Sequence, residues 1–255
     1  MKIQYVSDLH LEFKENSQYL KENPLDVAGE ILLIAGDSAY LDTPEFSGHP
    51  FWRWASANYK EVVVCLGNHE FYQYYDISKL ENGFCGEIMS NVHFYYNAVV
   101  RFDDVDIVVS TLWGHINPCD AYITEHNVSD FYRIRNGRYR LTAEAFNAEN
   151  EKCVAFVKRA VAKSKAKTKI VLTHHVPTNL AVAEEFKGSQ INGAFTCDLS
   201  DYIAVSDIDY WIYGHSHRNI EAMLGKTKIT CNQLGYVFNG EHLNNGYVKS
   251  KFIEI

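Results

Sequence analysis

Cysteine is scarce and dispersed in this sequence. The chain contains no Cys-x-x-Cys pair and no dense cluster, and its six cysteines are Cys65, Cys85, Cys119, Cys153, Cys197 and Cys231. This spacing argues against a disulfide framework and against a cysteine-bound structural zinc site. Reduced thiols are typical of the cytoplasm, so we expect a cytoplasmic protein.

Long apolar runs and a surplus of positive charge are also missing. No apolar run approaches the ~20 residues that span a bilayer, so we expect no membrane segment. The first residues, MKIQYVSDLH, contain no apolar stretch typical of a signal peptide, so we expect none. The formal net charge is −8, whereas proteins that grip extended nucleic acid through its phosphates are usually basic. An acidic surface can still surround a cationic metal centre, so small anionic substrates are not excluded.

The chain does contain enough apolar residues for one large core. It has 255 residues, of which 47% are hydrophobic, and it shows no internal repeat, low-complexity tract or linker. These features predict a single globular domain over residues 1–255.

The most informative stretch is Val62–Glu70, VVVCLGNHE. Its apolar part lacks alternation, which predicts a short strand buried on both faces. Gly67 ends this strand, and Asn68, His69 and Glu70 follow at once. The same order of apolar strand and polar residues occurs four more times, after Lys2–Val6, Ile31–Ala35, Lys169–Thr173 and Asp209–Tyr213.

The remaining elements are expected from periodicity and turn residues. Helices are predicted over 16–22, 50–59, 142–165 and 199–205, with Thr142 as the N-cap of the third. Further strands are predicted over 92–96, 98–102, 105–110, 226–231 and 247–255. The strands between 92 and 110 are close together, with Asn97 and Asp103-Asp104 as turns, which predicts a partly antiparallel hairpin run.

Polar side chains collect at the ends of the five apolar strands. Six of the eleven histidines lie in these segments, together with carboxylates and one amide; the residues are Asp8, His10, Asp37, Asn68, His69, His174, His175, His215 and His217. Each segment alone is compatible with a turn, a helix cap or a buried histidine. Five in succession after five strands favour one shared site. Carboxylate and imidazole ligands without cysteine suit Mn, Fe, Zn or Ni, and their number exceeds what one tetrahedral ion needs, which indicates two divalent ions.

The order Asp-x-His, Gly-Asp, Gly-Asn-His-Glu, His-His and Gly-His-x-His resembles that of the calcineurin-like metallophosphoesterases, along the full chain. The resemblance implies an α/β (α+β) fold: a four-layer αββα sandwich of two mixed sheets flanked by helices, with a dinuclear metal site at the strand ends. It implies these ligands: Asp8, His10 and His217 for one metal, Asn68, His174 and His215 for the other, and Asp37 as the bridge.

The resemblance also implies roles for residues beyond the ligands. His69 would be an unliganded general acid, and Glu70 would orient it. His174 matches the usual ligand position of the His-His pair, and His175 is the second choice. The later segment CNQLGY, residues 231–236, resembles the closing Asn-x-x-Gly-Tyr turn of bacterial relatives.

These residues predict a phosphoric ester hydrolase. Two metals can share a water, lower its pKa and aim it in line at phosphorus, while His69 protonates the departing alkoxide. The expected substrate is a phosphate ester of a small molecule or nucleotide, most readily a phosphodiester. GDSAYLD lacks the arginine of the protein-phosphatase motif GDxVDRG, which argues against a protein phosphatase. Two further functions compete with the hydrolase prediction: a non-catalytic metal-binding scaffold of the same fold, and a nuclease. The acidic charge argues against the nuclease.

Residues 112–141 do not fit the strand and helix rhythm, and they mix aromatic residues with arginine. About thirty aperiodic residues within a compact domain often form a lid or a substrate-facing insertion. Arg133 and Arg135 are therefore candidate substrate-binding residues, with His175 as a further candidate, because guanidinium groups grip anions in bidentate fashion. The competing interpretation is that aromatic residues pack this segment on the core and the arginines face water.

Overall fold

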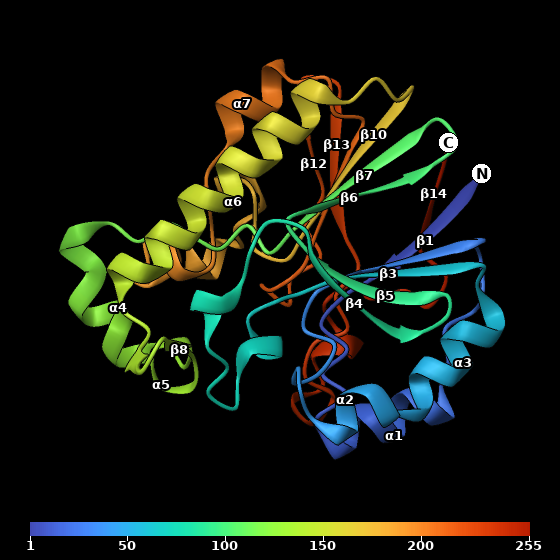
Figure 1. Cartoon of the computed structure of the whole chain (residues 1–255), viewed down its shortest axis with the longest axis horizontal. Coiled ribbons are helices and arrows are strands. Elements are labelled where there is room, and N and C mark those ends of the chain that lie inside the picture. The colour runs from blue at the N-terminus through green and yellow to red at the C-terminus, as the bar shows by residue number, and fades with distance from the viewer.

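The computed structural model describes the backbone of residues 1–255 and every side chain except those of Pro44 and Glu45. Two six-stranded mixed sheets pack face to face, and helices cover their outer faces (Figure 1). The expected four-layer α/β sandwich is confirmed. Among the helices of the described residues, none is both long and apolar enough to cross a bilayer.

The first sheet has the strand order β14-β1-β2-β3-β5-β4. Its bounds are β1 Lys2–Val6, β2 Ile31–Ala35, β3 Glu61–Cys65, β4 Phe84–Met89, β5 Val92–Tyr96 and β14 Phe252–Glu254. Strands β1, β2, β3 and β5 are parallel, and the two edge strands are antiparallel to their neighbours. The carboxyl ends of β1, β2 and β3 therefore lie at one edge of the sheet.

The second sheet has the order β12-β13-β11-β10-β7-β6. Its bounds are β6 Ala98–Phe102, β7 Val105–Ser110, β10 Thr168–Thr173, β11 Tyr210–Tyr213, β12 Ala222–Leu224 and β13 Thr227–Cys231. The four central strands are parallel, and the edges are again antiparallel. A separate short ribbon pairs β8 Arg135–Asn136 with β9 Tyr139–Arg140.

Seven α-helices complete the described fold: α1 Lys14–Glu22, α2 Pro44–Gly48, α3 Pro50–Asn58, α4 Ala121–Asn127, α5 Asp130–Arg133, α6 Ala143–Lys163 and α7 Ser200–Val205. Helices α1–α3 lie beside the first sheet, and α6 and α7 cover the second (Figure 1). Thr142 caps α6 as expected, because its side chain accepts a hydrogen bond from the Ala145 N–H at 3.2 Å.

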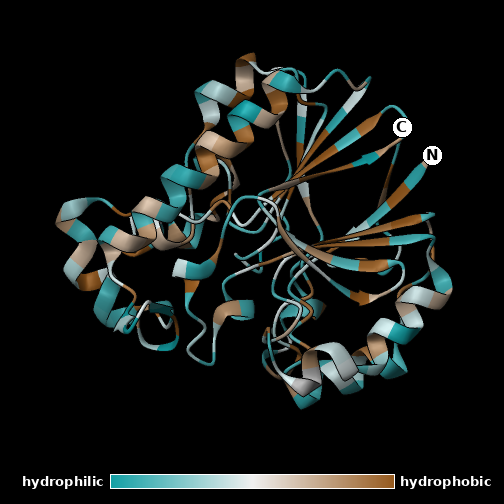
Figure 2. Ribbon diagram, viewed as in Figure 1, coloured by the Kyte–Doolittle hydropathy of each residue, from teal (hydrophilic) through white to brown (hydrophobic). Residues whose placement is uncertain are grey.

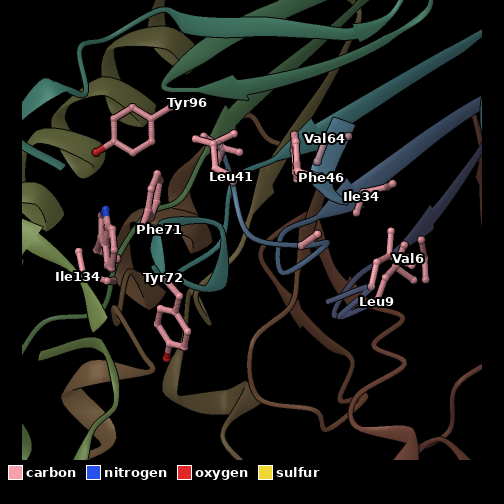
Figure 3. Packing of buried hydrophobic residues seen from close by; sticks show 14 of the residues in the cluster. Val6, Leu9, Ile34, Leu41, Phe46, Val64, Phe71, Tyr72, Tyr96 and Ile134 are labelled. Carbon is pink, nitrogen blue, oxygen red and sulfur yellow. The ribbon is translucent and has the colours of Figure 1, made fainter. Parts of the chain in front are cut away.

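The absence of alternation in the strands has a direct structural cause: both of their faces are buried. Along β2, Ile31 and Leu33 face the second sheet, while Leu32 and Ile34 face the helices. The strands are accordingly brown along most of their length in Figure 2, whereas the outer faces of the helices are largely teal. Figure 3 shows the layer between the first sheet and its helices, with Val64 of β3 close to Phe46 of α2.

Two expectations about secondary structure are wrong. Strands β5 and β6 do not form a hairpin, because the chain crosses from one sheet to the other at the buried Asn97, whose side-chain Oδ1 accepts from the Ser110 hydroxyl at 2.6 Å. Residues 247–255 contain only the three-residue strand β14. Residues 112–141, expected to form a lid or a substrate-facing insertion, contain α4, α5 and the β8–β9 ribbon. The β6–β7 hairpin, with Asp103-Asp104 as its turn, is confirmed.

Candidate active site

The five predicted polar segments meet where the carboxyl ends of both sheets face each other. Three segments follow β1, β2 and β3 of the first sheet, and two follow β10 and β11 of the second. Parallel strands put such segments at one edge, as expected for ligand sites in α/β sheets. The structure groups their side chains into overlapping sets whose ligand-type atoms lie within 4.8 Å of one another.

The first cluster contains Asp8, His10, Asp37 and His217. The His217 Nε2 lies 3.3 Å from the Asp8 Oδ1 and 3.1 Å from the His10 Nε2. The Asp37 Oδ2 is 3.8 Å from the His10 Nε2. All four residues are at least 92% buried, and their ring nitrogens and carboxylate oxygens converge.

The second cluster uses the other carboxylate oxygen of Asp37. The His174 Nε2 lies 3.2 Å from the Asp37 Oδ1, 3.0 Å from the Asn68 Oδ1 and 3.1 Å from the His215 Nδ1. One Asp37 oxygen therefore lies near each cluster.

The donor set fits divalent metal ions. With metal–nitrogen bonds of about 2.1 Å, adjacent ligand atoms at right angles lie about 3 Å apart, which matches the spacing within both clusters. The far nitrogen of each of three imidazoles already donates to an acceptor: His10 to Glu12 at 3.1 Å, His174 to the Ala35 carbonyl at 2.9 Å and His217 to Glu241 at 2.6 Å. The Nε2 lone pairs are therefore free for a cation, as in known metal sites.

The backbone around the clusters is strained where the ligands sit. The φ angles of five candidate ligands are positive: 55° at Asp8, 47° at His10, 52° at Asp37, 77° at His215 and 51° at His217. Such conformations are costly for residues with a side chain and are kept where the surrounding structure requires them, often at functional sites.

Two glycines leave room for the ligands. A Cβ on Gly67 would lie 2.3 Å from the Asp37 Oδ1, and one on Gly36 would lie 2.3 Å from the His174 Nδ1. Gly36 also has a φ of 87°, a conformation that glycine adopts at little cost. The Gly-Asp and Gly-Asn-His-Glu motifs therefore have a packing reason for their glycines, since no larger residue would leave the ligands in place.

His69 shares one group of ligand-type atoms with His10 and Asp37, and a residue outside the predicted set holds its ring. Its Nδ1 donates to the Glu12 Oε1 at 2.8 Å, and the same oxygen accepts from His10. Its Nε2 faces the Tyr236 hydroxyl at 3.3 Å and lies 3.9 Å from the Asp37 Oδ2. Burial alone would lower the pKa of His69, but the carboxylates of Asp37 and Glu12 outweigh it and raise that pKa.

The expected role of Glu70 needs correction, because its carboxylate bonds elsewhere. It accepts from the backbone N–H groups of Gly67, Asp37 and Ser38 at 2.7, 3.0 and 2.7 Å, and from the Ser38 hydroxyl at 2.6 Å. Among the hydrogen bonds of the described residues, none joins Glu70 to His69. Glu70 therefore fixes the loop that presents Asp37, and Glu12 takes the orienting position that the resemblance gave to Glu70.

Two further residues that the sequence did not reveal fix ligands. Asp130 is fully buried on α5 and accepts from the Asn68 side-chain amide at 2.8 Å, which turns the Asn68 oxygen toward His174. Glu241 accepts from His217 and from the Tyr236 N–H. Glu12 carried a weak signal, since it lies two residues after His10 in the sequence. Asp130 and Glu241 carried none.

A cleft of about 380 Å³ opens onto the clusters. Its walls come from the metal-ligand loops, from residues 127–130 and from residues 176–196. Arg133 and Arg135 are not among the described residues that line it; their guanidinium groups lie over the rings of Tyr72 and Tyr74 at 5.2 Å each. His175 is completely buried, and burial followed by the neighbouring His174 lowers its pKa to about 3. These three substrate-binding candidates therefore receive no support from the cleft.

The fold and the paired clusters match one family. Residues 1–219 match the model of the calcineurin-like phosphoesterases, and the chain belongs to that family. Members are typically dependent on divalent metal ions.

Two individual proteins resemble the chain along almost its whole length. An uncharacterized protein, L509 of Acanthamoeba polyphaga mimivirus, is 29% identical over 282 residues, covering 99% of this chain and 96% of that protein. The crystal structure of the phosphopantetheinyl hydrolase PptH from Mycobacterium tuberculosis superposes with a TM-score of 0.74 at 15% identity, covering 99% of this chain and 95% of that one. At 15% identity this similarity shows a shared fold alone.

Proposed function

We propose that this protein hydrolyses phosphate esters, with phosphodiesters of small molecules or nucleotides as the first candidates, using two divalent transition-metal ions. The observation that carries this proposal is the Asp37 carboxylate, whose two oxygens face two separate clusters of converging ligand atoms. Asp8, His10 and His217 would hold one ion, and Asn68, His174 and His215 the other. When bound, such ions stabilise the charge that grows on the phosphoryl oxygens and activate water as a nucleophile.

The chain's own residues supply orientation and a proton. Glu12, Asp130 and Glu241 fix the rotamers of His10, Asn68 and His217, so the ligand atoms keep their positions when the site is empty. Glu70 fixes the Asp37 backbone. Little rearrangement is then needed to bind metal and substrate, which is how a pre-organised site lowers a barrier.

In this proposal His69 acts as the general acid. His69 lines the cleft, shares one group of ligand-type atoms with His10 and Asp37, and has a pKa that the carboxylates of Asp37 and Glu12 raise. A donor at this position can protonate the departing alkoxide. Tyr236 lies within reach of the same nitrogen and limits how the ring can turn.

The test combines metal loading with a substrate panel. Metal-free protein is refilled with Mn, Fe, Zn or Ni and assayed on mono- and diesters, cyclic nucleotides, short nucleic acids and a phosphopantetheinyl ester, the last because PptH is named for that group. Metal-dependent turnover of a small ester supports the proposal. Stoichiometric metal binding without turnover of any ester would instead support a non-catalytic scaffold, and activity confined to nucleic acid would support a nuclease.

A further inference from the structure

One wall of the cleft comes from the segment that follows β10 and is largely apolar. This segment contributes six apolar residues to the lining, Val176, Val182, Ala183, Phe186, Ile191 and Phe195, together with the uncharged polar residues Ser189, Asn192 and Thr196. The ring of Phe195 stacks on the imidazole of the candidate ligand His215, with centroids 4.8 Å apart. The apolar wall therefore starts at the metal cluster itself, and a group attached to a bound phosphate would lie against it.

Lysine and arginine contribute little positive charge to the cleft, and the histidines that line it, His69, His215 and His217, belong to the candidate metal site. Among the described residues that line the cleft, Arg218 is the one lysine or arginine. Its Nε donates to Glu185 at 2.7 Å, and its guanidinium lies 5.4 Å from the centre of the Phe186 ring. Asp130 and Glu241 also line the cleft. A second anionic group on the substrate would thus meet one occupied guanidinium and two carboxyl groups.

From this wall and this charge balance we infer the substrate class: a phosphate ester whose organic group is uncharged and partly apolar, with no second phosphate or carboxylate. The inference rests on the proposed function, because it assumes that the phosphate binds at the two metal clusters. It disfavours nucleoside di- and triphosphates and nucleic acids. The volume of about 380 Å³ sets an upper size close to that of a small organic molecule.

Binding of n-alkylphosphonates to the metal-loaded protein tests the inference without requiring turnover. These compounds carry one phosphonate and one chain, so the chain has to follow the cleft from the metals. Calorimetry on the manganese-loaded protein should show that Kd falls with each methylene from methyl to hexyl, by up to about fourfold per fully buried methylene. The ω-carboxylate analogue of the pentyl compound should bind at least tenfold more weakly than pentylphosphonate.

Matched variants locate the effect on the proposed wall. Phe186→Ser should flatten the dependence on chain length while leaving the affinity for methylphosphonate unchanged. Phe252→Ser is the control, because Phe252 is also 39% exposed but lies on the edge strand β14, outside the cleft. Arg218→Gln should preserve the preference for the uncharged chain.

The outcomes separate the inference from the proposed function. Equal affinity for all chain lengths, or tighter binding of the carboxylate analogue, overturns the inference while leaving the metal site and the hydrolase proposal intact. A manganese-loaded protein that binds no phosphonate at all overturns the proposed function, and the inference with it. A dependence on chain length that Phe186→Ser and Phe252→Ser weaken equally overturns the assignment to this wall.

Discussion

Replacing Glu12 by glutamine should separate metal binding from proton donation. One Glu12 oxygen accepts from both His10 at 3.1 Å and His69 at 2.8 Å, and the side chain is 5% exposed. Glutamine keeps an oxygen in that place and removes the charge. A hydrogen bond to a charged group contributes about 1.5–3 kcal/mol, and 1.36 kcal/mol corresponds to tenfold. We therefore expect kcat at saturating metal to fall by about 10- to 150-fold.

The loss should depend on the leaving group. Esters of aliphatic alcohols need a proton from His69 as they leave, whereas nitrophenolate leaves without one. Glu12→Gln should therefore impair alkyl esters strongly and nitrophenyl esters weakly. Metal affinity should also fall, by about 10- to 100-fold, because His10 loses the anion that orients it. The assays are stopped-time turnover of both ester types at saturating manganese, and metal titration by calorimetry.

Glu241→Gln is the matched control. Glu241 bonds a candidate ligand, His217, as Glu12 bonds His10, but it has no contact with His69 among the described hydrogen bonds. The control should weaken metal binding to a similar degree and leave kcat near that of the wild type once the metal is saturating. The Glu12 Oε2 is buried without a partner among the described residues, so the new amide can also cost stability. Thermal unfolding of both variants measures that cost, and equal kcat losses for both ester types would refute the role assigned to Glu12.

The other predictions concern the metals and the acid. His69→Ala should lower turnover of alkyl esters by roughly 10²–10⁴ and leave metal content, measured by elemental analysis, nearly unchanged. Asp37→Asn should weaken both sites, since its two oxygens face both clusters; a wild-type protein that saturates at one ion per chain would contradict this. Burial would lower the pKa of His174 and His217, but Asp37 and Asp8 respectively raise these pKa values to about 9 and about 10. Metal binding at pH 7–8 should therefore release protons, and affinity should fall as the pH is lowered; calorimetry in buffers of different ionisation enthalpy counts those protons.

The sequence predicts well which polar residues come together at the strand ends, because the signal is local. An apolar run buried on both faces ends where its sheet ends, and Asp8, Asp37, Asn68 and His174 follow such runs closely. The predicted strands agree within one residue with β1, β2, β3, β10 and β11. Predictions of secondary structure from such local patterns of apolar residues are the most dependable ones that a sequence allows.

Contacts between distant segments are not predictable in the same way. Asp130 is 62 residues from Asn68, and Glu12 is 57 residues from His69. Nothing in the local pattern of Asp130 distinguishes it from a solvent-exposed carboxylate at a helix start. The resemblance pairs Glu70 with its sequence neighbour, yet the 3₁₀ turn His69–Phe71 points its carboxylate back toward the Asp37 loop. The last predicted strand is too long: the Lys251 carbonyl still accepts from the Tyr5 N–H of β1 at 3.2 Å, but the regular pairing with β1 is confined to Phe252–Glu254.

Two connecting segments line the cleft, residues 127–130 and residues 176–196. We expect changes in the first to affect metal binding and changes in the second to affect the choice of substrate. Residues 127–130 reach the cleft and also hold Asn68 through Asp130, so changes there alter the metal site together with the cleft. Val182 and Phe186 line the cleft without a hydrogen bond to any candidate ligand, so changes there alter only what the cleft accepts. Selection for a new ester is therefore expected to act on residues 182–186 and to leave 127–130 unchanged. Relatives that share all seven candidate ligands but differ in substrate should show this pattern, and variation centred on 127–130 would contradict it.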